Sequence, residues 1–204
     1  MDHYFTINKN AVAEFKDRGS KFIAYAFHIK TPDDFKQRLK ELKKEHPKAV
    51  HHCFAYRLGL DGNNFRVNDD GEPSGTAGKP ILAQIDSKNL TDILVVVVRY
   101  FGGTLLGVPG LINAYKTATA LVLQLTPTVK KQVEKVYTLN FDYTQINEVM
   151  TIIKQFNCTV IQQEMQLFCK ITIGIATKHL TEVLPLFKEL KGVEISEEGL
   201  VHKQ

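Results

Sequence analysis

The sequence contains no long apolar run, and this shortage excludes one class of protein. No stretch of eighteen uncharged apolar residues occurs among its 204 residues, so a membrane-spanning helix is not expected. The first ten residues, MDHYFTINKN, lack the basic segment followed by an apolar segment that a signal peptide needs. We therefore expect a cytoplasmic protein without a membrane partner.

Cysteine is also scarce. Cys53, Cys158 and Cys169 form no C-x-x-C pair. The last two lie in apolar, strand-like surroundings, where a thiol usually packs as a small hydrophobic side chain. We therefore expect no disulfide framework, no zinc knuckle, no metal site and no cofactor.

The excess of positive charge is small, at a formal +4, but it is unevenly distributed. Residues 1–135 contain 20 basic and 14 acidic side chains, whereas residues 136–204 contain 6 and 8. DNA is not an expected partner, although the first segment is mildly basic. Apolar residues make up 44% of the chain, enough for the core of one large or two small domains.

Sequence patterns in the first part of the chain predict a sheet flanked by helices. Strands are expected over residues 21–29, 51–60 and 91–101, and the turn DGNN after the second strand predicts a hairpin. The nearly unbroken β-branched run TDILVVVVRYF predicts a central strand that is buried on both faces. Helices are expected from Thr31-Pro32 to His46-Pro47 and over residues 111–125.

From Val136 the pattern restarts in the order β-α-β-β-α-β, which is typical of a ferredoxin-like sandwich. The expected strands are 137–143, 158–164, 167–176 and 192–201, and the expected helices are 146–156 and 179–190. Pro185 lies inside the second helix, which we expect to begin late or to bend there. Segment 126–135 is the expected linker, so we predict domains at 1–127 and 134–204.

The stretch DDGEPSGTAGKPIL, residues 69–82, combines three acids, three glycines and two hydroxyls. A Walker A phosphate loop is excluded, because only two residues separate Gly75 from Gly78 and a proline follows Lys79. One interpretation is a turn in which Ser74 caps a short helix that begins near Thr76, and Asp69, Asp70 and Glu72 bond loop amides. The other is an exposed contact surface.

Two further groups leave alternatives open. In RYFGGTLLGVPGL, Arg99 and the loop amides can bind an anion. Alternatively, Arg99 pairs with Asp69 or Asp70, Tyr100 and Phe101 pack in the core, and Gly102 and Gly103 only turn the chain. His51 and His52 point to opposite faces of a strand, which argues against a metal site. One of them can still meet Asp70 or Glu72 as an acid-base pair.

The helix over residues 32–45 has a basic face. Its cations are Lys36, Arg38, Lys40, Lys43 and Lys44. A solvated surface is one interpretation. The other is a track for RNA phosphates, which requires the positive charge to continue onto Arg57 or Arg66.

The segments KFIAYAFHI, HPKAVHHCFAYRLG, DDGEPSGTAGKPIL and VVVVRYFGGTLLGVPGLINAY resemble the YigZ/Impact family, and the likeness covers Gly19 to Tyr115 densely. It implies a first domain like the translation-factor and ribosomal-protein module, and a second like terminal domains of elongation factor G. Eukaryotic members are tied to translational control, and no catalytic residue carries over. Pro109 and Asn113 stand where the family usually has glycine and arginine; Asn113 removes a cation and weakens anion binding.

We therefore predict an α+β protein with an N-terminal mixed-sheet domain and a C-terminal ferredoxin-like βαββαβ domain. The preferred function is non-enzymatic, translation-associated binding of structured RNA or a ribosome-associated protein. The alternatives are an enzyme for a phosphorylated or acidic small molecule, with Asp70, Glu72 or His51 in proton transfer, and a scaffold whose motif only stabilises the fold. The candidate binding residues are His51, His52, Arg57, Asp69, Asp70, Glu72, Ser74, Thr76, Lys79, Arg99, Tyr100, Gly102, Gly103, Asn113 and Tyr115.

Overall fold

The chain divides into two compact units in a computed structural model that describes residues 2–199. One unit comprises Tyr4–Lys131, and the other comprises the described residues 2–3 and 132–199. The sequence-based limits of 1–127 and 134–204 stay a prediction about which segments fold independently. No helix within residues 2–199 is long and apolar enough to cross a membrane.

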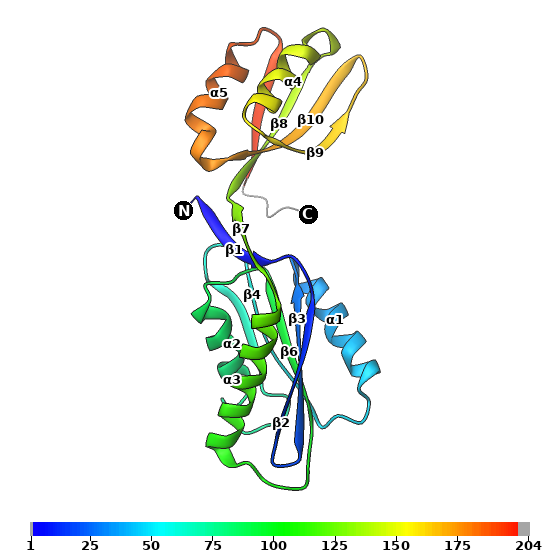
Figure 1. Cartoon of the computed structure of the whole chain (residues 1–204). Helices are drawn as coiled ribbons and strands as arrows, with labels where there is room; N and C mark the ends of the chain where they lie inside the picture. Colours follow the sequence, from blue (N-terminus) through cyan, green and yellow to red (C-terminus); the bar gives the residue numbers. More distant parts are fainter. Residues whose placement is uncertain (1, 200–204) are drawn as a thin grey trace. The chain divides into compact units, whose positions relative to one another are not determined.

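The first unit contains a five-stranded sheet and three helices (Figure 1). Its strands are β1 (His3–Ile7), β2 (Ala11–Asp17), β3 (Ser20–His28), β4 (His51–Leu58), β5 (Asn64–Asn68), β6 (Ile93–Tyr100) and β7 (Thr128–Gln132), and its helices are α1 (Pro32–Glu45), α2 (Gly78–Ser87) and α3 (Gly107–Leu125). The strand order is β2-β3-β6-β4-β5, and β1 pairs with β7 separately. Every neighbouring pair in the five-stranded sheet is antiparallel. The α+β class is confirmed, but the expectation of a mixed sheet is wrong for these strands.

Strand β6 occupies the centre of the sheet, as its β-branched sequence predicts. Side chains from Ile93 to Val98 are fully buried. Val95 and Val97 pack in a cluster with α2 and α3, whereas Val96 and Val98 pack in a second cluster with α1. Figure 1 shows α1 on one face of the sheet and α2 and α3 on the other. Covering both faces explains why the strand has no polar alternation.

Local capping fixes the start of α1 where the sequence predicts it. The Thr31 side chain accepts a hydrogen bond from the Asp34 N–H at 3.1 Å, and the Asp34 carboxylate accepts one from the Thr31 N–H at 3.0 Å. This reciprocal pair is a capping box, and Pro32 suits the first helical position because it lacks an N–H. The helix ends at Glu45, just before the predicted His46-Pro47 boundary.

Three sequence-based details of the first unit differ from the structure. Segment 78–87 forms a ten-residue helix, α2, and Ser74 does not cap it. Helix α3 begins at Gly107, four residues before the predicted start. The expected linker contains β7, because pairing with β1 gives this segment the hydrogen-bond partners of a strand.

The second unit has the predicted β-α-β-β-α-β order. Its elements are β8 (Glu134–Asp142), η1 (Tyr143–Gln145), α4 (Ile146–Gln155), β9 (Thr159–Glu164), β10 (Phe168–Ala176), η2 (Thr177–His179), α5 (Leu180–Glu189) and β11 (Val193–Gly199). The antiparallel strand order is β11-β8-β10-β9, and α4 and α5 share one core with this sheet. Helix α5 begins at Leu180 and continues through Pro185. Residues 200–201 of the last predicted strand lie outside the described residues.

Candidate functional site

The loop after β5 is organised by Asp69. Its carboxylate accepts hydrogen bonds from the N–H groups of Gly75 at 2.8 Å, Ala77 at 3.0 Å and Gly78 at 2.8 Å. Burial raises the pKa of Asp69, but these three donations outweigh it and hold the pKa below its ordinary value. Asp69 therefore takes the capping role at the start of α2 that the sequence suggested for Ser74.

Asp70 ties the same loop to β4. It adopts a positive φ of 43°, which a non-glycine residue tolerates mainly when it is Asn or Asp. Its carboxylate accepts a hydrogen bond from the His52 N–H at 2.7 Å, and its carbonyl lies 2.7 Å from His51 Nδ1. A carbonyl only accepts, so His51 Nδ1 carries the proton in this contact. Asp70 thus positions both the loop and the His51 ring.

Glu72 and Arg99 form a buried ion pair, although the two residues lie 27 positions apart in the sequence. Arg99 Nη1 donates to Glu72 Oε1 at 2.6 Å, and their side chains are only 6% and 3% exposed. The Tyr115 hydroxyl donates to the same oxygen at 2.7 Å. Arg99 pairs with Glu72, so the expectation that it pairs with Asp69 or Asp70 is wrong.

Side chains from two further strands, β3 and β4, complete this cluster. Arg99 Nη2 donates to Ser20 Oγ at 3.3 Å, and the Cys53 thiol lies 3.3 Å from the Tyr115 hydroxyl. Burial raises the pKa of the Cys53 thiol and of the Tyr115 hydroxyl well above their ordinary values. Both groups therefore stay protonated near neutral pH.

The two histidines lie on opposite faces of β4, as the alternation of a strand predicts. His51 lies on the face of α2 and α3, with its Nε2 3.8 Å from Glu72 Oε2. His52 lies on the face of α1, where burial lowers its pKa and its Nε2 has no hydrogen-bond partner within residues 2–199. Only His51 joins the cluster around Glu72.

A pocket of about 340 Å³ lies over the Glu72–Arg99 cluster. Its polar lining comes from His51, Glu72 and Arg99, and its apolar lining includes Val50, Pro73, Phe101, Leu105, Leu106, Val108 and Leu111. These apolar residues could not be recognised as a pocket lining from the sequence, because a wall of valines and leucines has the same composition as an ordinary core.

Several candidate residues lie away from this cluster. Arg57 donates to Asp86 at 2.8 Å and to the Gly62 carbonyl at 2.6 Å. Tyr100 faces α1, and its hydroxyl lies 2.8 Å from His46 Nδ1. Thr76 donates to the Pro73 carbonyl at 2.6 Å. Ser74, Lys79, Gly103 and Asn113 are exposed. Gly102 is also exposed, but its N–H donates to Ser20 Oγ of the cluster at 3.2 Å.

A second hollow, the basic groove, lies on the opposite face of the sheet. It has a volume of about 510 Å³. It is lined by Lys36, Leu39, Lys40, Lys43 and Lys44 of α1, by Phe35 and Phe54 beneath, and by Arg66 and Asn68 of β5. The positive charge of α1 therefore continues onto Arg66, whereas Arg57 does not line the groove.

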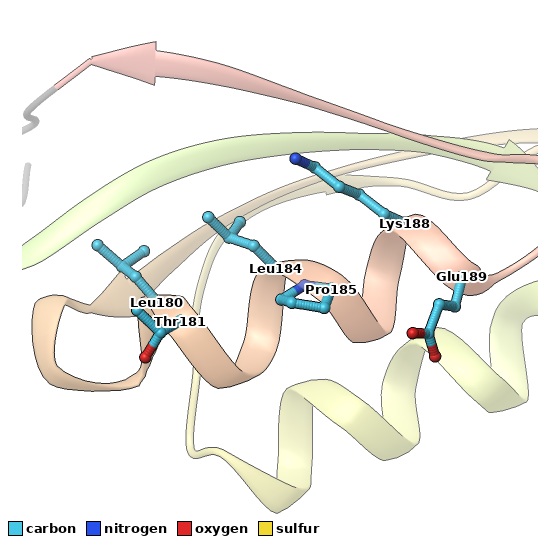
Figure 2. Close-up of a pocket in the computed structure, with 6 residues that line it drawn as sticks. All are labelled: Leu180, Thr181, Leu184, Pro185, Lys188 and Glu189. Atoms are coloured by element: carbon cyan, nitrogen blue, oxygen red, sulfur yellow. The ribbon is translucent and has the colours of Figure 1, made fainter.

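Other parts of the described chain contain fewer groups that could bind or react with a ligand. A hollow of about 440 Å³ lies along α5, where Figure 2 shows Leu180, Leu184 and Lys188 in one row and Thr181, Pro185 and Glu189 in the next. It contains no cluster of titratable groups beyond this one lysine and one glutamate. Within residues 2–199, no three His, Cys, Asp or Glu side chains gather as metal ligands.

Comparison with known proteins identifies similar chains. The family model described as the Impact N-terminal domain matches residues 18–123. An IMPACT family member from Haemophilus influenzae is 34% identical over 180 residues, which cover 87% of each chain. The Escherichia coli IMPACT family member YigZ is 34% identical over 165 residues, or 80% of this chain and 81% of YigZ. A crystal structure of a hypothetical protein matches with a TM-score of 0.75 and 29% identity over 100% of both chains.

Proposed function

The chain belongs to the IMPACT family, and from this premise we propose that it is a non-enzymatic, translation-associated regulator that binds structured RNA. The resemblance described above supports the link to translation, because eukaryotic members of the family are tied to translational control. The basic groove supports RNA as the partner. The single observation that carries the proposal is that Arg66 of β5 lines the same groove as the lysines of α1.

The lysines of the basic groove are spaced so that several of them can contact one polyanion. Lys36, Lys40, Lys43 and Lys44 are spaced at four, three and one positions, so they share a broad face of α1. Lys36 pairs with Asp33 at 2.8 Å, and Lys43 lies 3.8 Å from Asp70. The first pair is solvent-exposed and the second is partly exposed and long, so both are weak. These cations can accordingly exchange their partners for phosphates at little cost.

Arg66 is held in place by aromatic rings. Its guanidinium carbon lies 6.0 Å from the ring centroids of both Phe35 and Phe54. Such cation–π contacts orient an exposed arginine without consuming its hydrogen-bond donors. The pre-oriented guanidinium can fork onto a phosphate, which a lysine cannot do.

The floor of the groove indicates which feature of RNA is contacted. Phe35 and Phe54 are 4% and 2% exposed, so neither ring is available for a base to stack on. Contacts from lysines and Arg66 would therefore fall on the sugar-phosphate backbone. This arrangement favours a folded or double-stranded RNA, which proteins recognise mostly by shape.

The test is a binding measurement with a 20-base-pair RNA hairpin and, separately, with purified ribosomes over 50 to 200 mM salt. For about four phosphate contacts on a duplex, the logarithm of the association constant should fall with a slope of about −3.6 against the logarithm of salt. The variant Lys40→Gln/Lys44→Gln/Arg66→Gln should bind more weakly and reduce the magnitude of this slope by about 2 to 3.

A charge-matched control separates groove binding from general attraction. Lys9→Gln/Lys88→Gln/Lys116→Gln removes three exposed lysines of the same unit that do not line the groove. It should keep most of the affinity. Equal loss in both triple variants, or no binding to the hairpin at 50 mM salt, would refute the proposal. Binding to ribosomes but not to the hairpin would point instead to a ribosome-associated protein.

The competing enzyme for phosphorylated or acidic molecules receives less support. It requires Arg99 to hold the anion, but Glu72 already neutralises this guanidinium at 2.6 Å. Asn113 supplies no replacement charge and lies exposed on α3. The pocket over this pair therefore has to be considered for a different kind of ligand.

A further inference from the structure

The pocket over the Glu72–Arg99 pair has a polar floor and apolar walls. Helix α3 contributes Val108 and Leu111, and the preceding loop contributes Phe101, Leu105 and Leu106. Leu105 is 82% exposed, and Val50 and Val108 are both more than half exposed. Such exposed apolar side chains around a concave site are typical of ligand-binding surfaces. The walls therefore select an apolar group.

The floor of the pocket does not select an anion. Arg99 Nη1 donates to Glu72 and Nη2 donates to Ser20, whereas Nε is buried and has no hydrogen-bond partner within residues 2–199. The guanidinium and the carboxylate cancel one another's charge. A phosphate or carboxylate in the pocket would have to compete with Glu72 at 2.6 Å and lie close to its negative charge.

Two acceptor atoms of the floor lack hydrogen-bond donors among the described residues. Glu72 Oε1 accepts from both Arg99 and Tyr115, but Oε2 accepts from no side chain or amide within residues 2–199. His51 Nδ1 donates to the Asp70 carbonyl, so in the neutral ring Nε2 is an acceptor as well. These two atoms, Nε2 and Oε2, lie 3.8 Å apart.

A gap of 3.8 Å is too long for a direct hydrogen bond and suits one bridging group. A ligand nitrogen that lies about 2.9 Å from both Nε2 and Oε2 can donate one N–H to each of them. We propose that this pocket binds a neutral ligand in which an apolar or aromatic group carries an NH₂, as in a primary amide or an aromatic amine. Such a group supplies two donors from one atom.

The ligand has to be neutral because of the surroundings of the two acceptors. The cluster already contains one guanidinium paired with one carboxylate, both almost fully buried. An alkylammonium would bring a second positive charge next to Arg99 and would lose its hydration among apolar walls. An amide or aromatic amine makes the same two hydrogen bonds without this penalty.

Benzamide and acetophenone provide the sharpest test. They have nearly the same shape, but acetophenone has a methyl where benzamide has the NH₂. Titration of the ¹⁵N-labelled full chain at pH 8, followed by NMR, should show benzamide binding about tenfold or more tightly than acetophenone. The shifted amides should include residues 51, 72, 99 and 108.

Two variants test whether the preference for benzamide over acetophenone arises in this pocket. His51→Asn keeps a donor near the position of Nδ1, for the Asp70 carbonyl, but removes Nε2, so the preference for benzamide should fall to within about threefold. Val108→Trp places a large side chain at the mouth of the pocket from an exposed position, so both compounds should lose binding. Melting temperatures and NMR spectra of both variants establish that they fold.

The outcomes are distinct. Equal affinity of the wild type for the two compounds would overturn the assignment of paired acceptors. No binding of benzamide up to 20 mM, or a preference that survives His51→Asn unchanged, would do the same. Because the RNA variants lie on the other face of the sheet, failure here leaves the result for the basic groove unaffected.

Discussion

Replacing Glu72 by Gln should destabilise the first unit strongly, because it leaves a buried charge without its counter-ion. The Arg99 side chain is 6% exposed, and the Glu72 carboxylate lies 2.6 Å from Nη1. The amide introduced by Glu72→Gln could still accept from Tyr115, but it would carry no negative charge. Breaking one side of a buried ion pair costs about 3 to 5 kcal/mol.

The size of this effect can be measured in the intact chain. With a urea m-value of about 2 kcal/mol/M, a loss of about 4 kcal/mol lowers the unfolding midpoint by about 2 M. Because the chain has two units, unfolding should be followed by NMR cross-peaks of the β6 amides Val95 to Val98, which report on the first unit alone. The β10 amides of the second unit serve as an internal reference.

A double variant distinguishes a broken ion pair from a general loss of packing. Arg99→Met/Glu72→Gln removes both charges while keeping an acceptor for Tyr115. Its stability should lie within about 2 kcal/mol of the wild type, because removing both charges leaves no uncompensated charge in the buried site. A Glu72→Gln cost below about 1 kcal/mol, or a double variant less stable than the single, would refute the reasoning.

Two further predictions concern backbone packing and titration. Gly102→Ala should lower the free energy of unfolding by about 3 kcal/mol or more, since the added Cβ would lie 1.9 Å from the Gly19 carbonyl carbon. Gly103 has open space around it and a φ of 85°, so Gly103→Ala should lower this free energy by only about 1 to 2 kcal/mol. Equal midpoints in urea would contradict this contrast. Burial, followed by the charge of Glu45, raises the pKa of Tyr25 from 10.0 to about 12. The stability advantage of wild type over Tyr25→Phe should therefore be complete below pH 10 and disappear as pH rises through 12. Absorbance at 295 nm, which reports phenolate, measures this titration. An absorbance step near pH 10 that is present in the wild type and absent in Tyr25→Phe would contradict the raised pKa.

Features set by neighbouring residues were predictable from the sequence by itself. The run Ile93 to Val98 predicted a central strand, and Thr31, Pro32 and Asp34 predicted the start of α1, because β-branching and capping act within a few positions of the chain. The order of elements after Val136 likewise followed from hydrophobic periodicity. The same local rules offered a short helix beginning near Thr76 but assigned its cap to Ser74, whereas α2 begins at Gly78 and the Asp69 carboxylate accepts from its first amides.

Only the tertiary structure decided which chemical groups meet. From the sequence, Asp69 and Asp70 were possible partners for Arg99, because turn chemistry does not distinguish these two acids from Glu72. The folded loop directs Asp69 to the amides of α2 and Asp70 to β4, which leaves Glu72 for Arg99 and Tyr115. In the same way, the pairing of β4 with β5 brings Arg66 to the lysines of α1. Periodicity indicates the face on which a side chain lies, but the packing of loops and helices over that face determines its neighbours.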